Sequence, residues 1–240
     1  MGLGGEIDLT AQNGAMVVNA PQNAAGGDGG NICLLSGTTM QVAGGATMMA
    51  NANGDAGSGG EIDLESGGDM TVLADSDGTG SPAASSQDMQ SGGDGADVSM
   101  ISDKGKLTLN GKIDASGAAG GGGGNLDLEA TTDLTFSKQL FAMSTGAFGF
   151  GGDVSLFANG NVNVPQQVNT NGGTGSGGTF EATAGGTLTV SASVITDGTQ
   201  PTGGATLLEG CTVNLTSSGL ISALGPGGMN TLLSLSLIHI

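Results

Sequence analysis

The amino-acid sequence predicts an all-β protein: a right-handed parallel β-helix, a solenoid with three faces and about eight coils of roughly 28 residues. Two observations favour this fold. A glycine pair followed by alternating apolar residues recurs along the chain, and no window of about a dozen residues carries apolar residues at helical spacing without an interrupting glycine. The clearest copies of the repeat are residues 5–9, 30–34, 60–64, 124–128 and 152–156.

The first strand of each coil begins with one apolar marker residue. Side chains of a β-strand alternate between its two faces, so the marker and the residue two positions later are expected to be buried. The residue between them is expected to face solvent. The markers are Ile7, Ile32, Ile62, Val98, Leu126, Val154, Phe180 and Thr206.

Two further apolar pairs follow the markers and predict a second and a third short strand. Glycine, asparagine, aspartate and serine separate the pairs, as expected for turns. The second pairs are Met16/Val18, Met40/Val42, Met70/Val72, Leu107/Leu109, Leu134/Phe136, Val162/Val164, Leu188/Val190 and Val213/Leu215. The third, weaker pairs are Ile113/Ala115, Leu140/Ala142, Val168/Thr170, Val194/Thr196 and Leu220/Ser222.

Stacking of these strands predicts one continuous buried column. A single coil is not stable alone, because the burial of its inward side chains does not offset the ordering of its backbone. Stability must therefore come from contacts between coils. The residues expected in the column include Ile62, Leu64, Met70, Val72, Val98, Met100, Leu107, Leu109, Leu126, Leu128, Leu134, Phe136, Val154 and Leu156.

Two other interpretations of the composition stay open. The chain has 50 glycines and 5 prolines, which is typical of disorder when such a composition lacks a period. A left-handed or two-faced solenoid would also produce a repeat of this kind. The regular period favours an ordered, three-faced solenoid.

The outward residue between the two apolar positions of the first strand is acidic in alternate coils. Stacked carboxylates would lie about 4.8 Å apart and repel each other, whereas alternation separates them by about 10 Å, near the screening length at physiological salt. We interpret the pattern as charge management on a solvated face, with a metal-binding ladder as the alternative. The column reads Asp8, Cys33, Asp63, Ser99, Asp127, Ser155, Glu181 and Leu207.

The longest unit of the repeat contains the candidates for a metal site. Asp75 and Asp77 stand one residue apart before a glycine, as in a calcium loop, but the third alternate ligand and the closing glutamate are missing. Residues 92–99, which include Asp94, approximate a calcium-binding nonapeptide except for Ser99 at an apolar position. Asp75, Asp77 and Asp94 are therefore weak calcium candidates. An excursion loop is the favoured interpretation, and no other cofactor is expected.

The chain is strongly acidic. It carries 22 aspartates and glutamates against 4 lysines and no arginine, for a formal net charge of −18. Nucleic acid and anionic membrane surfaces would repel such a chain. No apolar run reaches the length of about 18 residues that a membrane span needs, so no membrane insertion is expected.

The residue types that catalysis needs are scarce. Arginine, tryptophan and tyrosine are absent, and His239 is the one histidine. No outward column stacks acidic residues on adjacent coils, as paired-carboxylate chemistry requires. We therefore expect no enzymatic activity. The alternative is a polysaccharide-active β-helix enzyme whose catalytic coils lie outside this fragment, since the fold also supports such enzymes.

Both ends of the chain are expected to be artificial. The repeat is already in phase by Gly4, and a ninth glycine pair begins at Gly227. We expect one repeat region over residues 1–234, truncated at both ends. Residues 235–240 resemble the translation of a sequencing adapter, and residues 231–240 are expected to pack poorly or as an irregular strand.

Cys33 and Cys211 are predicted to remain unpaired. They lie about six coils apart, roughly 29 Å at the inter-strand spacing, whereas a disulfide needs α-carbons within about 7 Å. Cys33 should point outward between Ile32 and Leu34, and Cys211 is expected in a turn. Two unpaired thiols fit an exported protein poorly.

Residues 60–72 (GEIDLESGGDMTV) and 106–117 (KLTLNGKIDASG) carry a family resemblance. In these blocks, and over residues 4–230 as a whole, the chain resembles the repeat region of filamentous haemagglutinin-like adhesins and, more loosely, autotransporter passengers. The resemblance implies a large bacterial protein, secreted or exposed at the cell surface, whose β-helix holds a binding region away from the cell. It assigns no functional residues, and the secretion domain of the family is not represented.

The expected function is thus a non-catalytic structural and binding stalk of an exported adhesin, located outside the cell or on its surface. Its ligand would be a host surface, a glycan or a biofilm component. A calcium-dependent surface-layer element is a further alternative beside the enzyme.

Overall fold

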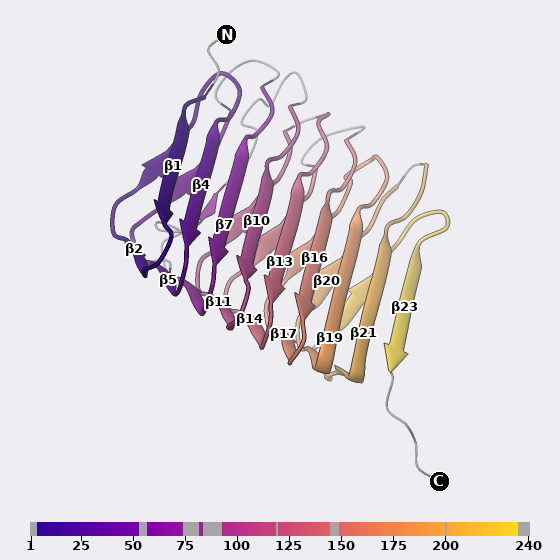
Figure 1. The fold of residues 1–240 in the computed structure, drawn as a ribbon. Helices are drawn as coiled ribbons and strands as arrows, with labels where there is room; N and C mark the ends of the chain where they lie inside the picture. The colour runs from indigo at the N-terminus through magenta and orange to yellow at the C-terminus, as the bar shows by residue number, and fades with distance from the viewer. Residues whose placement is uncertain are drawn as a thin grey trace.

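The computed structural model describes residues 4–52, 57–73, 82–83, 93–118, 120–144, 149–199 and 201–234, with backbone alone for 82–83. The regular elements in these ranges are all strands, wound into a parallel β-helix as the repeat predicted (Figure 1). Among the described residues, no helix is long and apolar enough to cross a membrane.

The first column of strands forms one side of the solenoid. Each strand pairs in parallel with its equivalent in the next coil. Figure 1 shows these strands as a row of arrows from β1 to β23. They are β1 (Glu6–Ala11), β4 (Asn31–Ser36), β7 (Glu61–Ser66), β10 (Asp97–Ser102), β13 (Asn125–Ala130), β16 (Asp153–Ala158), the first halves of β19 (Thr179–Val190) and β21 (Ala205–Leu215), and β23 (Met229–Ser234).

The second and third columns complete each coil. The second column joins the first in one 15-stranded sheet, because β19 and β21 run through the corner between the two columns. The third column is an 8-stranded sheet, which agrees with the prediction of about eight coils. The second column contains β2 (Met16–Val18), β5 (Met40–Val42), β8 (Met70–Val72), β11 (Leu107–Leu109), β14 (Leu134–Phe136), β17 (Val162–Val164) and the second halves of β19 and β21. The third contains β3 (Gln22–Asn23), β6 (Met48–Met49), β9 (Pro82–Ala83), β12 (Ile113–Asp114), β15 (Leu140–Phe141), β18 (Val168–Asn169), β20 (Ser193–Ile195) and β22 (Leu220–Ser222).

The predicted buried column is confirmed. Every residue named for it, from Ile62 to Leu156, is at most 2 % exposed, and all belong to one hydrophobic cluster. The outward residues Asp63 and Thr108 are partly exposed, as the predicted register requires. Burial in these strands therefore follows the pleat, with inward and outward side chains in alternation.

The strands of the first column bury one residue more than the repeat predicted. The extra position lies just before the corner and holds a small residue. In β7 and β10 it is serine, and the hydroxyls of Ser66 and Ser102 each donate a 2.7 Å hydrogen bond to the Gly68 carbonyl. Because a buried hydroxyl needs a partner, these bonds allow serine at a core position. The buried residues at this position are Ser36, Ser66, Ser102, Ala130, Ala158, Ala184 and Gly210.

The predicted third-strand pair Leu220/Ser222 is wrong by one residue. Val194 of β20 pairs with Ile221, which packs against the core, while Leu220 is 56 % exposed. The turn after Leu215 is two residues longer than the equivalent turn after Val190, so the inward residue of β22 is Ile221, one position after the predicted one.

β23 packs poorly, as expected for the start of residues 231–240, but its pairing is regular and not irregular. It pairs with β21 over its whole length, from Met229 to Ser234. Leu232 and Leu233 of this strand are exposed. Residues 235–240, including His239, lie outside the described residues.

Cys211 lies in β21 and not in a turn. It is exposed opposite Gly185, where the register between β19 and β21 shifts, and its thiol donates a 2.9 Å hydrogen bond to the Gly185 carbonyl. Cys33 is in the outward column as predicted, and both cysteines are free.

The glycine pairs let the backbones of neighbouring coils approach each other closely. A Cβ added at Gly152 would stand 1.9 Å from the carbonyl oxygen of Gly124, and one at Gly178 would stand 2.0 Å from that of Gly152. The N–H of Gly152 also donates a 2.7 Å hydrogen bond to the Ala142 carbonyl within its own coil. The stacking of coils therefore requires glycine at these positions, which explains why glycine marks the repeat.

Candidate functional site

The outer face of the first column displays the alternating acidic pattern that the sequence predicted. The parallel ladder aligns the central outward residues of successive strands one above another. Carboxylates occupy alternate coils through most of the column, so they are separated by two inter-strand spacings, roughly 10 Å. The aligned residues are Asp8, Cys33, Asp63, Ser99, Asp127, Ser155, Glu181 and Leu207.

From β4 to β16, a second outward column on the same face alternates apolar and acidic residues. It reads Leu35, Glu65, Ile101, Glu129 and Phe157. The apolar members are half-buried and lie in the coils that carry no acid in the central column. The sequence did not predict this second column, although each of its residues follows a residue of the central column by two positions. The first outward column of this face does not alternate, because Glu61 and Asp97 are direct partners on adjacent coils. The expectation that no outward column stacks acidic residues on adjacent coils is therefore wrong at this pair.

Three carboxylates on this face accept hydrogen bonds from described residues: Asp8 from the Thr10 hydroxyl, Asp97 from the Asn125 side-chain amide, and Asp153 from the Thr179 N–H and hydroxyl. The carboxylates of β7 differ, because Glu61, Asp63 and Glu65 accept no hydrogen bond from a described residue and form no ion pair with one. The ion pair that the structure shows lies on the third column, where the Lys112 ammonium stands 2.6 Å from the Asp114 carboxylate. The outer face of the first column is therefore negative without local compensation.

Aspartates at the corners of the coil are used differently. The Oδ1 atom of Asp133 accepts a 2.8 Å hydrogen bond from the Asn161 N–H and a 3.0 Å bond from the Asn161 side-chain amide. The Oδ1 atom of Asn161 in turn accepts a 2.9 Å bond from the Thr187 N–H. These three residues connect three consecutive coils, and each bond satisfies a backbone donor at a turn.

Two other corners show the same arrangement. Asp69 accepts a 3.0 Å hydrogen bond from the Lys106 N–H of the next coil. Asp197 accepts a 2.7 Å bond from the Leu224 N–H and a 2.6 Å bond from the Ser222 hydroxyl. The corner aspartates are therefore structural, whereas Glu61, Asp63 and Glu65 of β7 have no hydrogen-bond partner among the described residues.

Asp94, one of the three calcium candidates, is also engaged in coil-to-coil bonding. Its Oδ1 atom accepts a 2.7 Å hydrogen bond from the Gly122 N–H, and its carbonyl oxygen accepts a 2.9 Å bond from the Gly59 N–H. Asp94 thus connects its coil to the coils on both sides. Asp75 and Asp77 lie outside the described residues. Within the described ranges, no group of three or more histidine, cysteine or acidic side chains could hold a metal ion.

Cys33 is not an activated nucleophile. Burial raises the pKa of its thiol, and the negative charges of Asp63, Asp8, Glu61 and Glu65 raise it further. A thiol with a raised pKa stays protonated at neutral pH, whereas the thiolate is the reactive form. Burial, and after it the surrounding acids, therefore keep the Cys33 thiol in its less reactive form.

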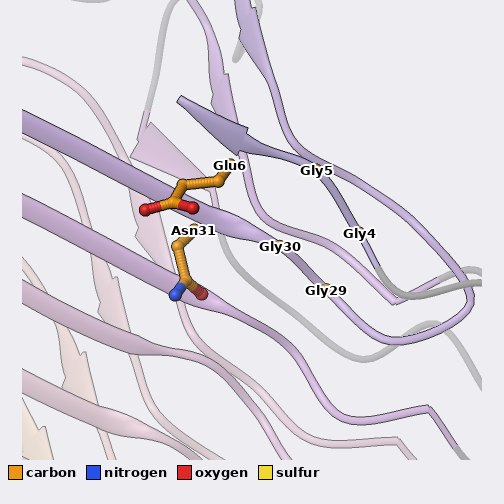
Figure 2. A pocket seen from close by; sticks show the side chains of 6 residues that line it. All are labelled: Gly4, Gly5, Glu6, Gly29, Gly30 and Asn31. Atoms are coloured by element: carbon orange, nitrogen blue, oxygen red, sulfur yellow. The ribbon is translucent and has the colours of Figure 1, made fainter. Parts of the chain in front are cut away.

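A hollow of about 290 Å³ lies at the corner where the chain enters β1 and β4 (Figure 2). Most of its wall is glycine backbone, and the two polar side chains are neighbours in the strand ladder. One carboxylate and one amide supply neither a nucleophile with its base nor a carboxylate pair, so the hollow does not assemble the groups of a hydrolase. The lining residues are Gly4, Gly5, Glu6, Gly29, Gly30 and Asn31.

Comparison of the chain with protein-family models, curated proteins and solved structures gives no match.

Proposed function

We propose that the chain is a section of the stalk of an exported bacterial adhesin, a non-catalytic rod that holds a binding region away from the cell. One observation carries this proposal: the parallel ladder of the first column continues from β1 to β23 through every coil. Each coil adds about 4.8 Å, so the stack is on the order of 40 Å long. A rod that grows by repetition of one unit is well suited to act as a spacer.

The corner aspartates and asparagines support a structural role. Asp133 and Asn161 link their coils to the next coils through hydrogen bonds to backbone N–H groups. Asp94 links to the coils on both sides of its own. These contacts join neighbouring coils along the rod, so the polar residues at the corners strengthen the stack.

The charge of the molecule limits its partners. With a formal net charge of −18 and an uncompensated acidic face, the rod repels nucleic acid and anionic membranes. The proposed location is outside the cell or on its surface. The proposed ligand, engaged by the binding region that the stalk carries, is a host surface, a glycan or a biofilm component.

Immunogold electron microscopy tests the location. An antibody raised against the 240-residue polypeptide should label intact bacteria that carry the gene, with gold particles displaced outward from the cell envelope. An antibody against a cytoplasmic protein is the control and should label only lysed cells. Labelling by both antibodies only after lysis would contradict the proposal.

Two further measurements distinguish the proposal from its alternatives. Purified chain incubated with acidic and neutral polysaccharides should release no new reducing ends, whereas release would favour a polysaccharide-active enzyme. Treatment of intact cells with a calcium chelator should leave the gold label in place. Loss of the label would favour a calcium-dependent surface-layer element.

A further inference from the structure

We draw no further inference here: the strongest candidate, the patch of unpaired carboxylates and half-buried apolar side chains on the outer face of the first column, is an acidic cluster, and no second observation in the described residues identifies what would bind to it.

Discussion

Aspartate has two separate roles in this solenoid, and the role depends on the position of the residue in the coil. At a corner, Asp133 accepts two hydrogen bonds from Asn161 of the next coil. On the outer face of the first column, the Asp63 carboxylate accepts none from the described residues and faces other negative charges. The first role stabilises the stack, and the second contributes charge to the surface.

Substitution by alanine should separate these roles. We expect Asp133→Ala to lower the free energy of unfolding by about 1 kcal/mol, because the Asn161 N–H loses its acceptor. Asp63→Ala is the matched control, and it should leave stability unchanged or raise it slightly, since it removes a charge from a repulsive face. Urea unfolding followed by circular dichroism measures both effects. Equal losses in the two variants would show that the corner bond has no special role.

The glycine pairs offer a second comparison between equivalent residues. A Cβ at Gly152 would stand 1.9 Å from a backbone oxygen of the preceding coil, whereas a Cβ at Gly5 would meet no atom within 4 Å. We expect Gly152→Ala to lower the free energy of unfolding by about 3 kcal/mol or more, because backbone atoms on both sides must move apart. Gly5→Ala should be tolerated. Thermal unfolding of the two variants measures the difference, and similar midpoints would contradict the close-packing explanation.

At the scale of the strand, the predictable features are those that a regular pattern determines. Ile62 and Leu64 were predicted to be buried because apolar residues alternate with polar ones, and the structure confirms it. Ser66 was missed because its burial depends on a hydrogen bond to the Gly68 carbonyl, a contact that exists only after the chain has turned the corner. A polar residue at a core position leaves no apolar signal in the sequence.

Turns of variable length set the other limit. The spacing between the second and third strands places Val194 correctly but misplaces the inward residue of β22, because the turn after Leu215 is longer. The outward position of Asp8, Asp63, Asp127 and Glu181 was predictable for the same reason as the core, since both follow the two-residue period of the strand. The apolar residues between the acids, such as Leu35 and Phe157, were not predicted, because the alternation of a strand places apolar side chains inward and these two lie at outward positions.

The corrected register of β22 has a direct test. Ile221→Ala should lower the free energy of unfolding by about 1 kcal/mol, because Ile221 packs partly against the core beside Val194. Leu220→Ala, in the same strand, should cost almost nothing, since that side chain is 56 % exposed. Chemical denaturation of both variants gives the comparison. A larger loss for Leu220→Ala would restore the register that the sequence predicted.

At the scale of the whole molecule, the coils depend on one another. The core is a single hydrophobic cluster that extends from Val18 to Leu208, so removal of a middle coil would interrupt both the cluster and the ladder. The acidic surface acts in the opposite direction, because like charges on neighbouring coils repel each other. The alternation of acids along the central outward positions, from Asp8 to Glu181, reduces that repulsion while the stack remains continuous.

The central claim is that these coils form one uninterrupted rod, and pulsed electron spin resonance tests it most directly. Spin labels at Asp8→Cys paired with Asp127→Cys, and at Asp8→Cys paired with Glu181→Cys, with both native cysteines replaced by serine, report distances along the outward column. The ladder predicts narrow distributions near about 19 Å and about 29 Å between the labelled backbones, an increase of one inter-strand spacing per coil. Broad distributions, or a second distance no longer than the first, would contradict the account.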